Sequence, residues 1–525
     1  MRKYLLSFAA LAAFSSAWSQ GQLTGDIMTN INFYENDKKI IEPNNSLYEN
    51  YKNGGEGWLS LRYNNNGFTG FLRVDAFQNS NLKYLTRPMT TFGVGAFSLS
   101  KDIDDLSVTV GYIYDQVGSG ILFRSYEDRG LLIDNALVGL SLKYKINDQL
   151  FVKGFAGQQK NNNLVNTFYA PIFKSATVEG DYSIGKVHIN PGVAALNRTL
   201  DQNSMDAVVA SINAQPISER FIPKFNMYAF TGYNNLTYEN ISWYVEGAYK
   251  TSEAISVNGK LMNEAGSTLY STLGWAKKGI ALNVSAKRTE NFVMRTSPSQ
   301  ILLDGMVNWQ PVVAIIRPHR LLARYSPASQ DNSEMAYKAD VFIAPNDDYN
   351  INLNYTHMNS LSGNKLYEEI FADAEYRGFK KWILGGGIQY LEYNLQVYRN
   401  EPLPFMFSVT PFVDVTYRIN DKKAIRVELE YQDKKQDMGS MFFGLAEFTV
   451  APKWSFALSN MYVFKPNYAK FENFNYPTIF TAYTKGPHRF SLAYVKQIAG
   501  INCTGGVCRY EPAFSGVRAM ITSSF

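Results

Sequence analysis

Large apolar residues fall on every second position through many segments of this sequence, a spacing that places them on one face of a β-strand. In 405–420 (FMFSVTPFVDVTYRIN) one face carries Phe405, Phe407, Val409, Val413, Val415, Tyr417 and Ile419, and polar residues such as Ser408, Asp414 and Arg418 share the other. The segment 241–250 (ISWYVEGAYK) alternates in the same way. Because a helix would scatter these residues around its axis, the pattern predicts strands.

The length of the segments separates two kinds of β-protein. A soluble β-sandwich also alternates, but its strands usually have only five or six residues. The segments here run for about ten residues, the length of a tilted membrane strand, and many carry an aromatic residue near one end, where membrane barrels have aromatic girdles. Only 18% of the residues are charged, whereas a soluble domain usually has about 25%. We therefore predict an all-β fold, a transmembrane antiparallel up-and-down β-barrel.

Short polar connections separate the predicted strands at eleven places, which are 64–66, 102–105, 147–148, 185–186, 238–240, 277–279, 346–348, 378–380, 420–422, 452–453 and 486–488. Between them lie longer stretches rich in Gly, Asn, Ser and Pro. Membrane barrels have short periplasmic turns, long external loops and, in bacteria, an even number of strands. With both termini on the turn side, eleven turns predict about 24 strands, within a range of about 22 to 26.

Residues 1–19 have the pattern of a cleaved secretory signal peptide. Arg2 and Lys3 precede an apolar run, and small residues stand just before Gln20. The mature chain, 20–525, is then expected to be a single barrel domain without a separate plug domain, because strands begin almost at its start. Cleavage removes two of the 51 basic residues and no acidic one, so 49 basic residues stand against 46 acidic ones, a net charge of +3. This balance does not suggest a nucleic-acid partner.

The stretch 291–333 is too apolar for a solvated external loop. Residues 312–316 read VVAII, between Pro311 and Pro318. Proline disfavours regular central strands, so we expect this stretch to fold inward; the alternative is an extra hairpin and about 26 strands. Natural transporters with 22 or more strands keep their wide lumen plugged. The lumen would thus be filled by inward loops or by another chain, or be an open pore.

The densest group of charges lies in FRSYEDRGLLID (123–134), in a predicted outer loop, and consists of Arg124, Glu127, Asp128, Arg129 and Asp134. On an inward loop, opposed charges could constrict a pore and select solutes, as charge rings do in channels. They could also form a mutually satisfied salt-bridge network that holds the loop. The two roles are compatible, and both stay open at this point.

Cys503 and Cys508 lie in the loop before the last strand. In an oxidising compartment we expect them to form a disulfide, which would hold the loop tip rigid. Two Cys without a nearby His cannot complete a zinc site.

The last strand places Val517, Ala519, Ile521 and Phe525 on one face and ends on an aromatic residue. Outer-membrane barrels generally carry such a strand, which the barrel-assembly machinery recognises.

Catalysis finds little support in the sequence. The four His residues are scattered, and the sequence contains no nucleophile elbow, zinc motif or phosphate-binding glycine loop. We therefore expect no catalytic, cofactor-binding or metal site; the exception would be a barrel hydrolase whose Ser, His and Asp meet only in the fold. We interpret four charges on lumen-facing strand positions as solvated wall: Lys250, Arg418, Glu428 and Glu430.

Together with the hairpins, FRSYEDRGLLIDNALVG (123–139) and CTGGVCRYEPAFSGV (503–517) resemble a Bacteroidota outer-membrane β-barrel family, a domain of unknown function. The resemblance spans the mature chain and implies a fold and a location, the outer membrane of a Gram-negative bacterium, but no activity.

The polar lumen suggests a porin-like or gated channel for a hydrophilic solute. The alternative is a non-transporting scaffold that docks a partner protein in an export or assembly machine. The expected partners are outer-membrane lipid, the barrel-assembly machinery, and a small solute or a partner protein.

Overall fold

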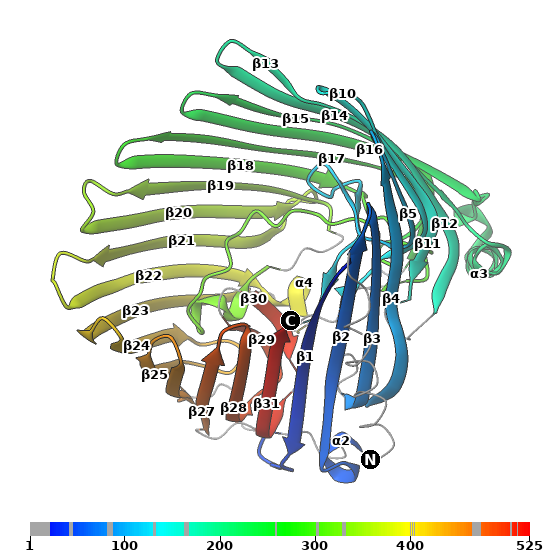
Figure 1. Ribbon diagram of the computed structural model, residues 1–525. Helices are drawn as coiled ribbons and strands as arrows, with labels where there is room; N and C mark the ends of the chain where they lie inside the picture. Colours follow the sequence, from blue (N-terminus) through cyan, green and yellow to red (C-terminus); the bar gives the residue numbers. More distant parts are fainter. Residues whose placement is uncertain are drawn as a thin grey trace.

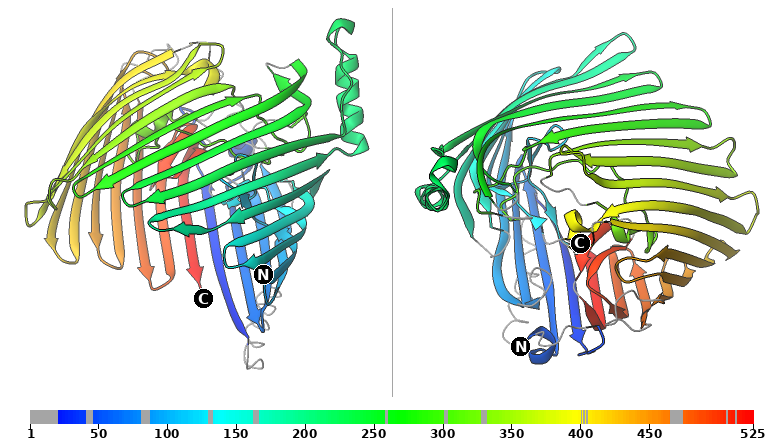
Figure 2. Two further views of the ribbon diagram at one scale, coloured as in Figure 1. Left: turned by 90° about the horizontal axis from the view of Figure 1, so that it is seen from above. Right: turned by 180° about the vertical axis from the view of Figure 1, so that it is seen from behind.

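The structure is a computed structural model in which one antiparallel sheet closes into a barrel (Figures 1 and 2). It describes residues 21–40, 46–80, 88–129, 133–161, 167–257, 260–300, 304–327, 332–399, 401, 403, 405–464, 474–504, 507–511 and 513–525. The predicted signal peptide, 1–19, lies outside these residues and stays a prediction, as does the absence of a separate plug domain.

The first half of the wall comprises β1 (Gln22–Tyr34), β2 (Asn53–Asn65), β3 (Phe68–Ser80), β4 (Met89–Ile103), β5 (Leu106–Ile113), β10 (Leu137–Asn147), β11 (Leu150–Lys160), β12 (Phe168–Gly180), β13 (Tyr182–Ile184), β14 (Val187–Thr199), β15 (Asn226–Tyr238), β16 (Ile241–Val257) and β17 (Lys260–Lys277). The second half comprises β18 (Ile280–Glu290), β19 (Glu334–Ile343), β20 (Tyr349–Ser360), β21 (Lys365–Tyr376), β22 (Trp382–Asn394), β23 (Phe405–Asn420), β24 (Lys423–Lys434), β25 (Met441–Val450), β26 (Trp454–Val463), β27 (Phe474–Lys485), β28 (His488–Gln497) and β31 (Phe514–Ser524). The connections carry α2 (Ser46–Asn50), β6 (Gln116–Val117), β7 (Phe123–Arg124), β8 (Glu127–Asp128), β9 (Ile133–Asp134), α3 (Gln202–Asn213), η2 (Ile217–Glu219), η3 (Leu322–Tyr325), α4 (Leu395–Arg399), β29 (Gly500–Thr504) and β30 (Val507–Glu511).

The barrel has 24 strands, as the count of turns predicts. The sheet contains 25 strand segments, but β12 and β13 both pair with β14 and are one strand interrupted at Asp181. The last strand, β31, pairs with β28 on one side and β1 on the other and so closes the ring. The alternative of 26 strands is therefore wrong.

All eleven predicted turns join neighbouring antiparallel strands. Gly185 and Gly486 show why these sites suit tight turns: their φ angles are +62° and +57°, a region that glycine enters without steric cost. The connections at the other end of the barrel are mostly longer, and one of them carries α3 at the rim, outside the wall (Figures 1 and 2).

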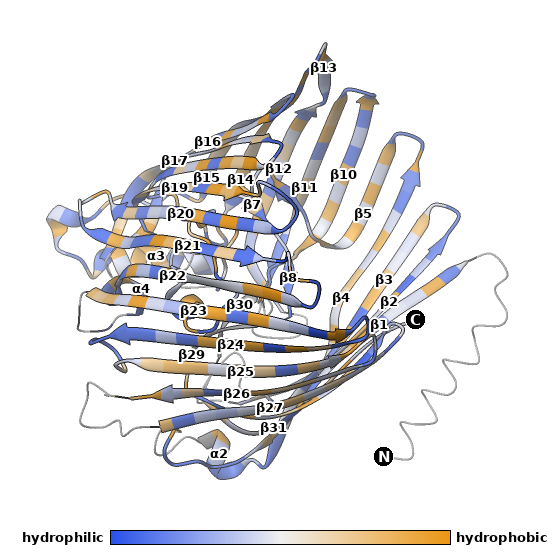
Figure 3. Ribbon diagram, turned by 90° about the vertical axis from the view of Figure 1, so that its left-hand side faces the viewer, coloured by the Kyte–Doolittle hydropathy of each residue, from blue (hydrophilic) through white to orange (hydrophobic). Residues whose placement is uncertain are grey.

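Hydrophobic and hydrophilic residues alternate along many strands (Figure 3), and this alternation separates an outer face from an inner one. On β23, Phe407, Val409 and Val413 are exposed on the outside, whereas Ser408 and Thr410 are buried on the inside. The face assignments predicted for this strand are confirmed. None of the described helices is long and apolar enough to cross a membrane.

The described residues of two connections, 114–136 between β5 and β10 and 291–333 between β18 and β19, lie within the barrel (Figure 1). Ile121, Phe123 and Val307 from these connections are completely buried against inward-facing residues of β11 to β16, such as Phe155 and Phe173. The main apolar core is thus formed between the lumen segments and the wall.

Candidate functional site: the filled lumen

We call the described residues of 291–333 the lumen segment. After β18 it first contacts the side of the barrel that contains β14 to β16, and it then crosses to the side formed by β21 to β27. Leu321, Leu322 and Tyr325 are fully buried near its far end. Apart from η3 the segment is irregular, so hydrogen bonds of regular structure do not satisfy most of its backbone.

Wall side chains supply many of those missing hydrogen bonds. Five wall side chains donate to backbone carbonyls of the segment: Lys250 to Val293 (2.8 Å), Arg198 to Arg295 (3.1 Å), Gln159 to Met306 (2.6 Å), Lys287 to Pro311 (2.8 Å) and Gln432 to Leu321 (3.1 Å). The Glu430 carboxylate accepts from the backbone N–H groups of Arg320 (2.9 Å) and Leu321 (2.8 Å). Irregular backbone at membrane depth is tolerated only where it is buried in protein or lines a water-filled cavity. Hydrogen bonds from wall side chains therefore hold the irregular backbone of the segment in place.

The interpretation of the wall charges as solvated is wrong for three of the four residues. Lys250, Glu428 and Glu430 are buried, whereas Arg418 is exposed. Lys250 forms an ion pair with Glu253 at 2.6 Å, and Glu430 binds the segment backbone. The pattern correctly placed these residues inside the barrel, but it could not show that the chain itself fills the space they face.

Arg317 links the segment to the wall through a side-chain ion pair. Arg317 donates to both oxygens of Glu369 on β21, at 3.0 and 2.7 Å, and to Asn354 at 2.8 Å. Its guanidinium also lies over the Phe371 ring, 3.7 Å from the centroid. Both charged groups are buried, so neither has water as an alternative partner.

A second contact joins η3 to the connection between β24 and β25. The Tyr325 hydroxyl donates to Asp437, and Arg324 lies 3.7 Å from the same carboxylate. Burial alone would raise the pKa of Asp437, but Lys434, Arg324 and Arg399 outweigh burial and hold that pKa well below its ordinary value. This carboxylate therefore stays charged and retains the end of the segment.

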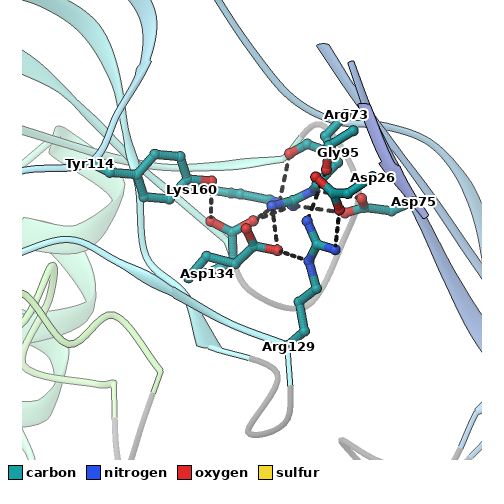
Figure 4. A network of polar contacts seen from close by, with 10 residues as sticks. Asp26, Arg73, Asp75, Gly95, Tyr114, Arg129, Asp134 and Lys160 are labelled. Atoms are coloured by element: carbon teal, nitrogen blue, oxygen red, sulfur yellow. Dashed lines mark hydrogen bonds and ion pairs between the residues drawn. The ribbon is translucent and has the colours of Figure 1, made fainter. Parts of the chain in front are cut away.

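The predicted charge cluster in 123–134 is partly assembled in a buried network (Figure 4). Its centre is Arg73 on β3, which is only 1% exposed. Arg73 binds Asp75 at 2.7 Å, Asp134 at 2.5 Å and Glu127 at 2.9 Å. Arg129 extends the network, because it binds Glu127 at 2.8 Å and Asp26 on β1 at 2.9 Å.

Asp134 has three partners in this network. It accepts from Arg73, from Lys160 on β11 at 2.5 Å and from the Tyr114 hydroxyl at 3.0 Å. Burial opposes its ionisation, but Lys160 and Arg73 outweigh burial and lower the pKa of the carboxyl. Lys160 also donates to the Gly95 carbonyl at 2.8 Å, so the network binds the 114–136 connection to β3, β4 and β11.

The structure thus brings together Glu127, Arg129 and Asp134. The fourth candidate, Arg124, lies instead over the rings of Tyr126 (4.2 Å) and Trp309 (4.8 Å), and Asp128 pairs through its backbone with Ile133 in the hairpin β8–β9. Sequence reasoning missed the wall partners, which are Asp26, Arg73, Asp75 and Lys160. The one available signal was that Arg73 and Asp75 stand two positions apart on the same strand face.

The two lumen connections also bind each other. Arg124 N–H donates to the Val307 carbonyl, and Trp309 N–H donates to the Gly120 carbonyl, both at 3.0 Å. The Asn308 side chain donates to the Ile121 carbonyl at 2.9 Å. Movement of one connection therefore disturbs the other.

His319 of the lumen segment faces Asp414 on β23 and Glu428 on β24, with one potential ligand atom of each within 4.8 Å of the other two. Its ring packs on Phe412, with 4.1 Å between centroids. Burial lowers the pKa of His319, against the opposing effect of Glu428 and Asp414. Arg426 binds both carboxylates.

The hydrolase exception requires Ser, His and Asp within reach of one another. Among the described residues, Ser, His and Asp come near one another at the connection between β12 and β14. Ser183 Oγ lies 3.0 Å from His188 Nδ1, and His188 Nε2 lies 3.6 Å from Asp181. The second distance is too long for a hydrogen bond, and the Ser and Asp are exposed to solvent. This geometry fits a polar turn better than a catalytic triad.

Cys503 and Cys508 stand opposite each other in the register of the hairpin β29–β30. This hairpin lies beside η3 of the lumen segment. The two side chains lie outside the described part of the structure, and the disulfide stays a prediction.

The model of a family described as "Family of unknown function (DUF6029)" matches residues 1–525, so the chain belongs to this family. The sequence matches no curated protein. Among solved structures, the E. coli P pilus tip assembly intermediate PapC–PapD–PapK–PapG has a TM-score of 0.51 at 10% identity, and the match covers 97% of this chain and 62% of that chain. The P pilus usher PapC translocation pore has a TM-score of 0.46 at 9% identity, with 96% and 99% covered.

The siderophore receptor PirA from Pseudomonas aeruginosa has a TM-score of 0.43 at 10% identity, with 96% of this chain and 80% of that chain covered. At such identities the likeness concerns the fold alone. The chain is an outer-membrane-type β-barrel. The Bacteroidota origin that the sequence resemblance implies stays a prediction.

Proposed function

We propose that this member of the DUF6029 family is a gated channel for a hydrophilic solute in the outer membrane of a Gram-negative bacterium, and that the lumen segment is its gate. One observation carries the proposal. The wall behind the segment is lined by charged and amide side chains, among them Arg198, Lys287, Glu369 and Glu430. A wall of this kind can be wetted when the segment moves, whereas an apolar wall would favour dewetting.

The contacts of the gate can be broken one at a time. Glu369→Gln removes one charge of the buried pair and leaves the Arg317 guanidinium without its carboxylate. Breaking a buried pair in this way costs about 3–5 kcal/mol, whereas replacing both partners by well-packed hydrophobic residues of similar volume is often neutral. The single variant should therefore favour an open gate, and Arg317→Met/Glu369→Met should close it again.

Single-channel conductance in planar bilayers tests the proposal. We expect rare openings for the wild type, frequent openings for Glu369→Gln, and a steady ohmic current when residues 296–326 are replaced by a Gly/Ser linker. The matched control is Glu239→Gln, which leaves Lys186 unpaired at an exposed turn and should behave as the wild type. A steady wild-type current equal to that of the linker variant would refute the gate, and so would a linker variant that conducts no current.

A scaffold that docks a partner protein is the second candidate, and the rim near α3 favours it. Ile217 and Ile222 are 83% and 87% exposed in the connection between β14 and β15. If the protein is such a scaffold, a stoichiometric partner should copurify with the wild type in detergent. The double variant Ile217→Ser/Ile222→Ser should no longer bind this partner. Ile184→Ser, at an exposed turn at the other end of the barrel, should retain it. A barrel that purifies alone and conducts when its gate contacts are broken would exclude this candidate.

A further inference from the structure

We propose that His319, Asp414 and Glu428 form a site for a divalent first-row transition-metal ion, which joins the lumen segment to strands β23 and β24. The three residues come from three separate elements, so an ion bound by all of them would link the segment to the wall. The site does not depend on the gating proposal, because ion binding can be measured without conductance.

The donor set favours this class of ion. One imidazole nitrogen and two carboxylates are typical ligands of zinc and of other first-row divalent metals, whereas Mg²⁺ and Ca²⁺ take oxygen ligands. The potential ligand atoms lie within 4.8 Å of one another. Because ligands bind zinc at about 2.0–2.2 Å, side-chain movements of roughly an ångström would bring all three onto one ion.

A second observation is independent of the carboxylates. His319 is 9% exposed, and its Nδ1 is completely buried without a hydrogen-bond partner among the described residues. Buried polar atoms are hydrogen-bonded in the great majority of cases, so this nitrogen needs an explanation. A metal ion bound at Nδ1 would supply one.

The charges around the site also leave room for a divalent cation. Asp414 and Glu428 carry two negative charges when ionised, against one positive charge on Arg426. Arg426 lies 2.5 Å from Asp414 and also contacts Glu428, but a carboxylate has about four lone-pair positions and can bind a guanidinium and a metal together. The site therefore keeps a net negative charge for a cation with Arg426 in place, and a divalent ion would bind more tightly without Arg426.

Titration of the full-length protein with ZnCl₂ tests the site. The protein is purified without a polyhistidine tag, freed of metal with EDTA and followed by isothermal titration calorimetry, and visible absorption with CoCl₂ reports the nitrogen ligand. We expect one saturable zinc site per chain. His319→Gln should weaken binding at least about tenfold, the lower range for lost outer-shell partners, and Arg426→Gln should strengthen it.

His357→Gln is the matched control, because this His lies on β20 with its ring stacked against Tyr337, and it should bind zinc as the wild type does. Heat-modifiable migration in electrophoresis checks that each variant forms a barrel. The proposal fails if the wild type shows no saturable zinc binding, if folded His319→Gln binds zinc equally well, or if Arg426→Gln weakens binding. The proposal also fails if the wild type binds calcium as tightly as zinc and His319→Gln binds calcium as tightly as the wild type does.

Discussion

Substitution of Asp134 by Asn should release the 114–136 connection from the wall. The Asp134 carboxylate lies 2.5 Å from both the Arg73 and the Lys160 side chains. Asn has nearly the same shape but carries no charge, so the change leaves two buried cations with one anion fewer. Arg73 keeps Asp75 and Glu127, whereas Lys160 keeps the Gly95 carbonyl.

The expected cost follows from these remaining contacts. Removing one partner of a buried ion pair costs about 3–5 kcal/mol, and the partners retained by Arg73 argue for the lower end, about 3 kcal/mol. Since each 1.4 kcal/mol is a factor of ten, local opening of the connection should become about a hundredfold more frequent. Hydrogen exchange of amides in 114–136, measured by mass spectrometry on the detergent-solubilised barrel, reports this change directly.

The same carboxyl predicts a pH dependence of exchange. Its pKa is lowered in the folded state, so the stabilisation is present above the unfolded value of about 3.9 and is lost as the pH falls through the folded value. After correction for intrinsic exchange rates, protection should be constant from about pH 7 to pH 5 and should fall below about pH 4.

Two variants control this experiment. Asp148→Asn removes an exposed partner of Lys145 at a turn and should leave protection unchanged. Lys160→Met/Asp134→Asn removes one uncompensated cation and should recover part of the loss. Wild-type protection in Asp134→Asn, or strictly additive effects in the double variant, would show that the network does not hold the connection.

Three further results are expected. Gly95→Ala should destabilise the barrel by about 1–3 kcal/mol, because a Cβ there would lie 2.0 Å from the Asp75 carboxylate, and a lower denaturation midpoint would show this. At Gly232 a Cβ meets no atom within 4 Å, so Gly232→Ala should be nearly neutral. Cys503 and Cys508 should resist alkylation until a reductant is added, and prompt alkylation of the unreduced protein would exclude the disulfide. Mass spectrometry of protein extracted from outer membranes should find Gln20 at the N-terminus, and a retained 1–19 segment would contradict cleavage.

The strands and turns could be predicted because their signals are local. Alternation on β23 depends on residues two positions apart, and each short turn is marked by a few polar residues, so the strand count follows from the sequence. The network could not be predicted in the same way. Arg73 lies 61 positions from Asp134, and Arg129 lies 103 positions from Asp26. Such pairs become visible only once the barrel is closed and its interior is filled.

The error about Lys250, Glu428 and Glu430 has a more general cause. An open pore needs polar side chains on the inner face because water fills it. A barrel filled by an irregular segment of its own chain needs them as well, because the segment's backbone groups must find hydrogen-bond partners. Alternation of polar and apolar residues therefore predicts the inner face but cannot distinguish these two interiors.

The distinguishing signal lies outside the strands, in an apolar run within a long connection. In this chain that signal is 312–316, from which Val313 and Ala314 pack against β19 to β23. An apolar run in a solvated loop would be costly to expose, whereas inside the barrel it contacts inward-facing apolar residues. The same interior nevertheless keeps charged wall residues behind the run. On the gating that we propose, departure of the segment would bring those charges into contact with water and give a hydrophilic channel without any change in the wall.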